Sequence, residues 1–128
     1  MVTGIEHVGI YAKDSKGLAQ WYVDMFGCTI AYENPEKGTY FVAFSDKSMI
    51  EICKADKASC RKPELTQSGI RHIALTVDDF DAVVKKLKDA KTEIVTDAVT
   101  SPKGIKTMFF RDAAGNILHL ISRPAPLI

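Results

Sequence analysis

The sequence predicts an α+β fold in which two tandem βαβββ modules form a cupped, mostly antiparallel sheet around a metal site. Three observations predict it: a strand motif that occurs twice, a helical apolar stripe after each copy, and three strand-like segments after each stripe. Two half-size modules must share a core, because neither buries enough surface alone. We therefore expect one domain over residues 1–128, with module 1 at about 1–54, a linker at about 55–68 and module 2 at about 69–128.

The repeat is visible in two short segments that begin the modules. IEHVGI at residues 5–10 matches IRHIAL at residues 70–75 in the order apolar, charged, His, apolar, small, apolar, which aligns His7 with His72. Each segment leads to an aspartate, Asp14 or Asp79, whose carboxylate can accept hydrogen bonds from the first free N–H groups of a helix. The pattern predicts a strand, a cap and a helix in both modules.

Both predicted helices have one apolar face. Their apolar residues recur three and four positions apart, as one side of a helix requires, and a glycine able to adopt the left-handed conformation follows the first stripe. The first stripe and its stop are Leu18, Trp21, Tyr22, Met25, Phe26 and Gly27. The second stripe is Phe80, Val83, Val84, Leu87 and Ala90. The lysines between the residues of the second stripe are expected on a solvated helix surface.

Three strand candidates follow each helix. In module 1 they are Cys28–Glu33, Thr39–Ser45 and Ser48–Lys54. In module 2 they are Thr92–Val99, Ile105–Arg111 and Asn116–Ser122. Short polar turns precede the last strand of each module, and the second turn contains Gly and Asn, which tolerate positive φ. The predicted order is therefore βαβββ in each module.

Strand alternation places four potential metal ligands on the face away from the helices. His7 and His72 alternate with aliphatic residues that should pack against the helices. Glu51 and His119 interrupt apolar strands at corresponding positions of the last strand in each module. One strand histidine alone is more often a packed residue, but a carboxylate inside an apolar strand is costly to bury without a charged partner. We predict one divalent metal, Ni, Zn, Co, Mn or Fe, bound by these four residues.

Composition argues against several other classes of protein. The chain has 17 basic and 16 acidic residues, and its lysines are scattered, so nucleic acid is not an expected partner. It contains no uninterrupted apolar segment of signal-peptide or membrane-spanning length, so we expect a cytoplasmic protein that does not bind membranes. Cys28, Cys53 and Cys60 are odd in number and form no CxxC motif, which favours reduced thiols.

The motifs resemble those of the vicinal oxygen chelate superfamily, which includes glyoxalases, bleomycin-resistance proteins and extradiol dioxygenases. The resemblance extends over essentially the whole chain and is closest to glyoxalase I-like members. The segments that carry it are IEHVGI at 5–10, WYVDMFG at 21–27, IEI at 50–52, RHIA at 71–74 and FRDAAGNILHL at 110–120. It implies a cup that holds a metal with open positions for the vicinal oxygens of a small-molecule substrate. It also implies frequent dimers, so we expect a homodimer.

The resemblance also implies roles for individual residues. His7, Glu51 and His72 match the positions that carry His, Glu and His in glyoxalase I-like members. Those members usually have Glu where this chain has His119, and in them that carboxylate takes part in proton transfer. Because metal-bound imidazole is a weaker base, His119 separates this chain from the simplest lactoylglutathione lyase assignment.

Three functions follow as hypotheses. The leading one is a lyase or isomerase in which the metal holds two adjacent substrate oxygens, an enediolate forms, and Glu51 moves the proton between carbons. The second is an Fe(II)-dependent ring-cleaving or related dioxygenase. The third is a non-catalytic, drug-binding module like the bleomycin-resistance proteins, against which retention of all four ligand positions argues.

Six further side chains have a strand position compatible with lining the cup. They are Tyr11, Tyr40, Phe44, Met49, Met108 and Phe110. Core packing accounts for each of them equally well, so the sequence leaves both interpretations open.

Overall fold

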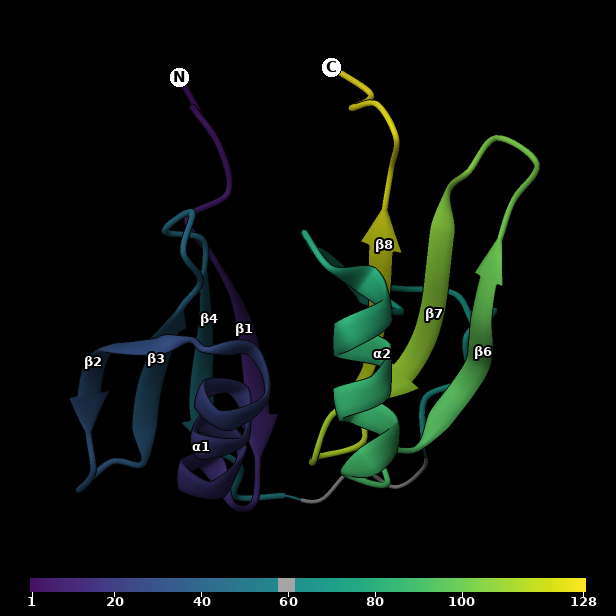
Figure 1. Cartoon of the computed structure of the whole chain (residues 1–128). Helices are drawn as coiled ribbons and strands as arrows, with labels where there is room; N and C mark the ends of the chain where they lie inside the picture. The colour runs from purple at the N-terminus through teal and green to yellow at the C-terminus, as the bar shows by residue number, and fades with distance from the viewer. Residues whose placement is uncertain (58–61) are drawn as a thin grey trace. The chain divides into compact units, whose positions relative to one another are not determined.

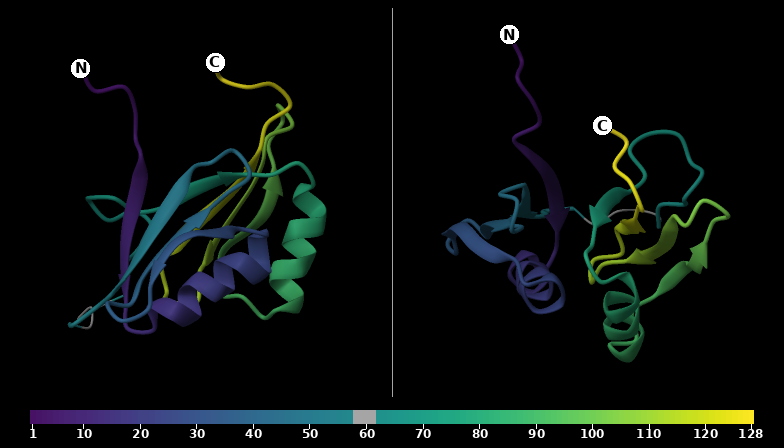
Figure 2. Two further views of the ribbon diagram at one scale, coloured as in Figure 1. Left: turned by 90° about the vertical axis from the view of Figure 1, so that its left-hand side faces the viewer. Right: turned by 45° about the horizontal axis from the view of Figure 1, so that its top comes forward.

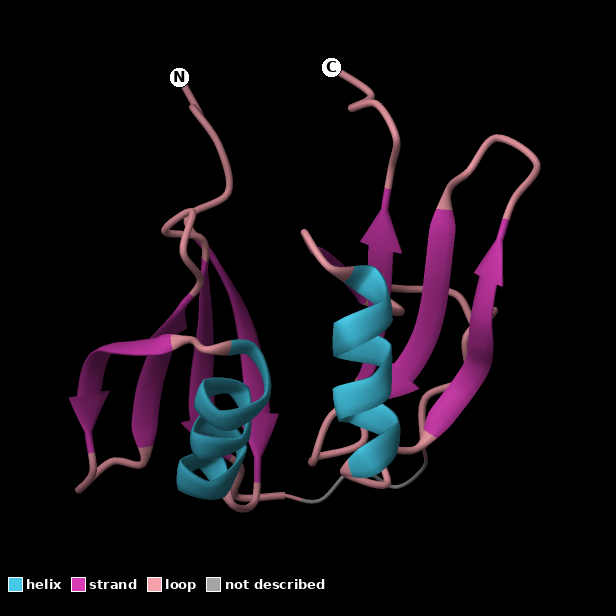
Figure 3. Cartoon of the chain, viewed as in Figure 1, coloured by secondary structure: helices cyan, strands magenta, loops and turns pink. Residues whose placement is uncertain are grey.

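The computed structural model describes residues 1–57 and 62–128 and divides into two compact units (Figure 1). The N-terminal unit is residues 1–60 and the C-terminal unit is residues 61–128. Each unit contains one helix and one four-stranded sheet (Figure 3). The predicted α+β class and the βαβββ order of both modules are confirmed. That the two units share a core and form a single domain stays a prediction.

The N-terminal unit forms a mixed sheet with the strand order β1-β4-β3-β2. Its elements are β1 (His7–Ala12), α1 (Ser15–Phe26), β2 (Thr29–Asn34), β3 (Thr39–Ala43) and β4 (Met49–Lys54). The first and last strands, β1 and β4, are parallel neighbours, and the other two pairs are antiparallel. Parallel neighbours need a long connection, and the helix and two strands between β1 and β4 provide it.

The C-terminal unit repeats this topology with the strand order β5-β8-β7-β6. Its elements are β5 (Ile73–Thr76), α2 (Phe80–Asp89), β6 (Ile94–Thr100), β7 (Lys106–Arg111) and β8 (Ile117–Ser122). Again the first and last strands, β5 and β8, are parallel. Among the described residues, neither α1 nor α2 has the length and apolarity that crossing a membrane requires.

The first strand of the C-terminal unit is shorter than the sequence predicts. Its pairing with β8 begins at Ile73, opposite Leu118, so His72 lies just before the strand and not within it. The alternation nevertheless continues through this residue: His72, Ala74 and Thr76 are exposed, whereas the residues between them are half-buried. His72 therefore keeps the predicted side of the sheet without the predicted strand pairing.

Both helices begin at the predicted aspartates. The Asp14 carboxylate accepts a hydrogen bond from the Gly17 N–H at 2.9 Å, and Asp79 accepts one from the Ala82 N–H at 3.1 Å. Helix α1 ends at Gly27, which adopts the left-handed conformation with φ 68°. After α2 the corresponding left-handed residue is Lys91, with φ 57°. A lysine is strained there, because its Cβ crowds the backbone in this region.

We expect Lys91→Gly to raise the free energy of unfolding by about 0.5–1 kcal/mol, because glycine adopts positive φ without a steric penalty. Urea unfolding followed by circular dichroism measures the change. Lys91→Ala is the matched control: it removes the same long side chain but keeps the Cβ, so no gain is expected. A gain of equal size in both variants would show that the lysine side chain, and not the backbone conformation, is responsible.

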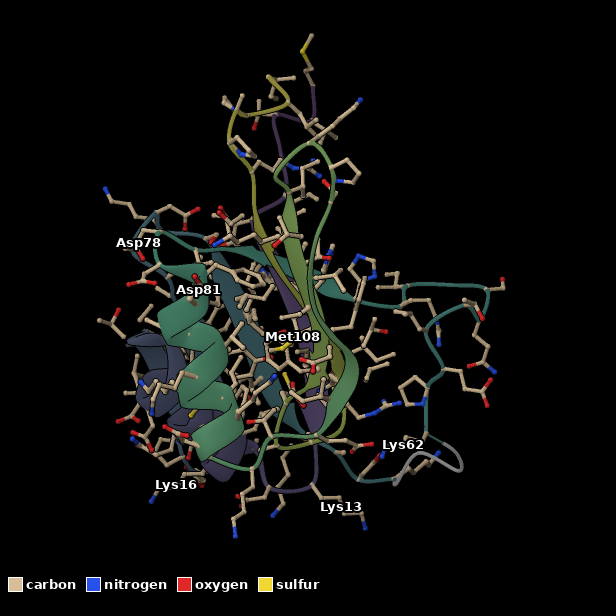
Figure 4. The ribbon with its side chains drawn as sticks, turned by 45° about the vertical axis from the view of Figure 1, so that its right-hand side comes forward. Lys13, Lys16, Lys62, Asp78, Asp81 and Met108 are labelled. Carbon is tan, nitrogen blue, oxygen red and sulfur yellow. The ribbon has the colours of Figure 1, made fainter. Side chains whose placement is uncertain are left out.

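Each core lies between the helix and one face of its own sheet. In the N-terminal unit α1 packs across all four strands (Figure 2) and covers Ile10, Val42, Ile50 and Ile52, which are at most 8% exposed. The fully buried residues of the C-terminal unit are Leu87, Met108, Phe110, Leu118 and Leu120 (Figure 4 labels Met108). Tyr40 is also buried. Tyr40, Met108 and Phe110 therefore belong to the cores and do not line a ligand site.

The predicted linker, residues 55–68, includes residues 58–61 and with them Cys60, which lie outside the described residues. The part that follows is attached to the C-terminal unit. Lys62 Nζ binds both carboxylate oxygens of Glu93, at 2.6 and 2.7 Å, and Arg111 donates from Nη2 to the Pro63 carbonyl at 3.0 Å. Residues 62 and 63 therefore pack with the C-terminal unit as part of its structure.

Candidate functional site

The first pair of predicted ligands lies on the face of the N-terminal sheet opposite α1. His7 begins β1 and Glu51 lies in the middle of β4, with His7 Nε2 3.7 Å from Glu51 Oε1. Ile50 and Ile52, on either side of Glu51, are buried on the helix side. The side chains of His7 and Glu51 are 35% and 28% exposed, respectively. The carboxylate is therefore half-buried beside an imidazole, on the side of the sheet that the alternation predicts.

A second carboxylate orients His7. Glu6 Oε2 forms a hydrogen bond with His7 Nδ1, and this bond raises the pKa of His7 from its ordinary value, against the opposing effect of burial. The charges of Glu6 and Glu51 contribute in the same direction as the bond. With Nδ1 engaged by Glu6, Nε2 is the ring nitrogen that faces Glu51. Histidines that bind metals are commonly oriented in this way, through a carboxylate on the other ring nitrogen.

The second pair of predicted ligands lies in the C-terminal unit. The rings of His72 and His119 are 5.2 Å apart and nearly perpendicular. Burial, followed by the charge of His72, lowers the pKa of His119, so its imidazole is neutral at physiological pH. Within the part of the chain that the structure describes, His119 Nε2 is buried without a hydrogen-bond partner. A neutral imidazole nitrogen without a partner is costly to bury, and it is the form that binds a metal.

One phenylalanine adjoins each pair. Phe41 lies opposite Glu51 in the sheet, and its ring is 5.3 Å from that of His7. Phe109 lies opposite His119, stacks on its ring at 4.1 Å and meets His72 edge-on at 5.3 Å. Neither phenylalanine is among the residues that the sequence pattern predicts for the site. The internal repeat does relate them, because Phe41 and Phe109 are separated along the chain by the same interval as Glu51 and His119.

A small residue lies beside each of the two predicted ligands on the last strands, Glu51 and His119. Gly9 is opposite Glu51 in the pairing of β1 with β4, and Ala74 is opposite His119 in the pairing of β5 with β8. A Cβ added at Gly9 would be 3.8 Å from Glu51 Oε1, which is an ordinary van der Waals distance. A side chain as small as a methyl group therefore fits at this position, and Ala74 has such a side chain in the second module. These small residues leave room above the sheet for the ligand side chains.

The structure brings the four predicted ligands together as two pairs, one in each unit. His7 and Glu51 form the N-terminal pair, and His72 and His119 form the C-terminal pair. Over residues 1–57 and 62–128, no three His, Cys, Asp or Glu side chains lie close enough together to hold a metal ion. A site made of all four residues is therefore a prediction that goes beyond the two pairs.

The two described cysteines are free thiols with different surroundings. Cys28 is buried, and burial raises the pKa of its thiol to about 11. Cys53 is half-buried on the same face as Glu51, and burial, followed by the charge of Glu51, raises the pKa of its thiol. Cys28 therefore packs as a small buried hydrophobe, whereas Cys53 has polar neighbours near the N-terminal pair.

Comparison with known proteins identifies similar sequences and folds. The family model of the Glyoxalase/Bleomycin resistance protein/Dioxygenase superfamily matches residues 4–120. A glyoxalase family protein from Enterococcus faecalis has a similar structure, with a TM-score of 0.74, 26% identity and coverage of 94% of this chain and 98% of that one. Lactoylglutathione lyase from Agrobacterium tumefaciens shares the fold, with a TM-score of 0.68, 20% identity and coverage of 94% and 93%.

Two curated relatives are similar in sequence. Biphenyl-2,3-diol 1,2-dioxygenase 3 of Rhodococcus globerulus is 24% identical over 119 residues, which cover 91% of this chain and 61% of that protein. The chain thus spans about three fifths of the dioxygenase's length. The uncharacterized protein YaeR of Escherichia coli (strain K12) is 28% identical over 122 residues, covering 91% of this chain and 93% of YaeR.

Proposed function

Because the chain belongs to the glyoxalase/bleomycin resistance protein/dioxygenase superfamily, we propose that it is a metal-dependent lyase or isomerase of the glyoxalase I type. Its substrate is a small molecule with two adjacent oxygens, and the reaction passes through an enediolate. The observation that carries the proposal is the occurrence of two donor pairs, His7 with Glu51 and His72 with His119, at repeat-related positions. The proposed homodimer and cytoplasmic location accompany this function as predictions.

The four side chains fit a divalent metal in their chemistry. Imidazole nitrogens and a carboxylate oxygen are suitable donors for Ni, Zn, Co, Mn and Fe. Glu6 already binds the other nitrogen of His7, and the buried Nε2 of His119 lacks a partner among the described residues. Since a pair of donors is half of a four-ligand set, the proposal requires both pairs to bind the same ion. The units that supply them belong either to one chain or to two copies of it.

When bound, the metal supplies a Lewis acid that polarises a substrate carbonyl. The chain supplies the base. Glu51 is the one carboxylate among the four proposed ligands, and its partial exposure lets it reach a substrate proton and return it to the neighbouring carbon. His119 is unsuited to this task, because a neutral imidazole that binds a metal through one nitrogen carries a proton on the other and has no free lone pair. Phe41 and Phe109 provide apolar surfaces beside the two pairs.

The experiment that tests this function measures turnover after the purified full-length chain is loaded separately with each candidate metal. A panel of α-ketoaldehyde–thiol adducts and acyl-CoA epimers is supplied, and oxygen is monitored at the same time. We expect conversion of at least one adduct or epimer without oxygen uptake. Elemental analysis of protein purified without added metal should find a divalent ion. A metal-free protein that gains no activity with any metal would instead favour the drug-binding alternative.

A second candidate is an Fe(II)-dependent ring-cleaving dioxygenase. The similarity to biphenyl-2,3-diol 1,2-dioxygenase 3 over 91% of this chain favours it. The donor set also includes two histidines and one carboxylate, the combination typical of non-heme iron oxygenases. An oxygen electrode separates the two candidates: oxygen uptake with catechols by the anaerobically iron-loaded protein would support the dioxygenase and contradict the lyase.

A further inference from the structure

A row of polar side chains lies next to Glu51 and crosses three strands of the N-terminal sheet. Cys53 follows Glu51 by two residues on β4, so both side chains point to the face opposite α1. Tyr11 of β1 is directly opposite Cys53 in the strand pairing. Thr39 begins β3, the neighbour of β4 on its other side. The side chains of Glu51, Tyr11 and Thr39 are close enough to Cys53 to act on the pKa of its thiol: Glu51 raises it, and Tyr11 and Thr39 lower it.

The C-terminal unit has an aliphatic residue at the corresponding position. Ile121 follows His119 on β8 as Cys53 follows Glu51 on β4, and it is opposite Thr76 on one side and Thr107 on the other. Its side chain cannot donate to the neighbouring ligand, His119. The two modules thus repeat the ligand positions but differ in what adjoins them. The polar row accompanies the carboxylate, which is the ligand proposed to move a proton.

The chemistry of the row suits the support of a carboxylate. A cysteine thiol is protonated at neutral pH, so its S–H can donate to Glu51, while the sulfur can accept from the hydroxyls of Tyr11 and Thr39. Hydrogen bonds from such neighbours orient carboxylates that bind metals. Packing alone does not account for the row, because Cys53 is only half-buried and Tyr11 is 71% exposed.

We propose that Cys53 is a positioning residue whose thiol holds the Glu51 carboxylate in the orientation needed for metal binding and proton transfer, and that Tyr11 and Thr39 hold the thiol. This inference rests on the proposed function, since it concerns the same carboxylate. It adds three residues that adjoin the N-terminal pair, Tyr11, Thr39 and Cys53, of which Cys53 has no polar counterpart beside the C-terminal pair.

The test uses Co²⁺ as the probe and the full-length chain. Four variants are compared with the wild type: Cys53→Ala, Cys53→Ser, Tyr11→Phe and Tyr32→Phe. We expect Cys53→Ala to weaken Co²⁺ binding by about tenfold and to change the visible spectrum of the bound ion. Cys53→Ser keeps a donor and should restore both. Tyr11→Phe should produce a smaller change in the same direction.

Tyr32→Phe is the matched control for Tyr11→Phe. Tyr32 is an exposed tyrosine of the same sheet, on β2, which β3 separates from the strand of Cys53, and its ring contacts Phe41. The variant's affinity for Co²⁺ and its spectrum should equal those of the wild type. If Cys53→Ala fails to fold, Tyr11→Phe decides the question, because it removes one hydroxyl from an exposed ring.

Three results would overturn the inference. Unchanged Co²⁺ affinity and spectrum in Cys53→Ala, or in Tyr11→Phe where Cys53→Ala does not fold, would exclude the positioning role while leaving the proposed function intact. A thiolate-to-cobalt charge-transfer band that Cys53→Ser abolishes would make Cys53 a ligand. A wild-type protein that binds no Co²⁺ or any other candidate metal would remove the proposed function and this inference together.

Discussion

Replacing Glu51 by glutamine is expected to reduce kcat by about 10²- to 10⁴-fold, the range that a general base contributes. The amide has nearly the shape of the carboxylate, and the side chain is partly exposed, so the fold should be retained. An amide cannot accept the substrate proton, which is the physical reason for the loss. The measurement is kcat at saturating metal on the substrate found by the panel, together with the metal content of the variant.

Glu33→Gln provides the control for this substitution. Glu33 lies on β2 of the same sheet and is exposed, so the change removes an equal charge away from the proposed ligands. Its kcat should match that of the wild type. Full activity of Glu51→Gln with metal bound would contradict the proton-transfer role. Equal losses in both variants would trace the effect to net charge.

Metal binding is expected to stabilise the fold strongly. At a free metal concentration about 1,000 times Kd, an ion that binds only the folded state raises the free energy of unfolding by about 4 kcal/mol. His119→Phe should abolish this gain, because it removes the buried Nε2 but keeps an aromatic ring against Phe109. Urea unfolding with and without each candidate metal measures the difference.

Without metal, His119→Phe is not expected to lose stability, in contrast to its effect when metal is present. Removing a buried nitrogen that has no partner among the described residues also removes a desolvation cost of about 1–3 kcal/mol. Metal-free His119→Phe should therefore be at least as stable as the metal-free wild type. A variant that unfolds easily without metal, or a wild type that no candidate metal stabilises, would contradict the role assigned to His119.

Much of the fold follows from local patterns in the sequence. Helix α1 begins and ends where Asp14 and Gly27 predict, because capping and positive φ depend on single residues. Strand alternation correctly separates Glu51 from Ile50 and Ile52, because the pleat has a fixed period of two. A few consecutive residues are enough to predict such features.

Other features depend on which strands pair, and the local pattern does not contain this information. The polar row of Tyr11, Cys53 and Thr39 exists only because β1 and β3 flank β4 in one register. The local pattern does not reveal the position of Phe41 for the same reason. A phenylalanine in an apolar strand is usually a core residue, and its place opposite Glu51 depends on the register. The end of α2 was harder to predict because Lys91 occupies a conformation that glycine usually marks.

The strand order has a consequence for how each ligand pair is held. In the order β1-β4-β3-β2, β1 is at the edge of its sheet and β4 is inside it, and β5 and β8 have the same relation. Each pair thus combines a residue on or beside an edge strand, His7 or His72, with one on an interior strand. Edge strands are hydrogen-bonded along one side only, so they open with less free energy than interior strands. Fraying at the edge can separate two ligands while the rest of the unit stays folded.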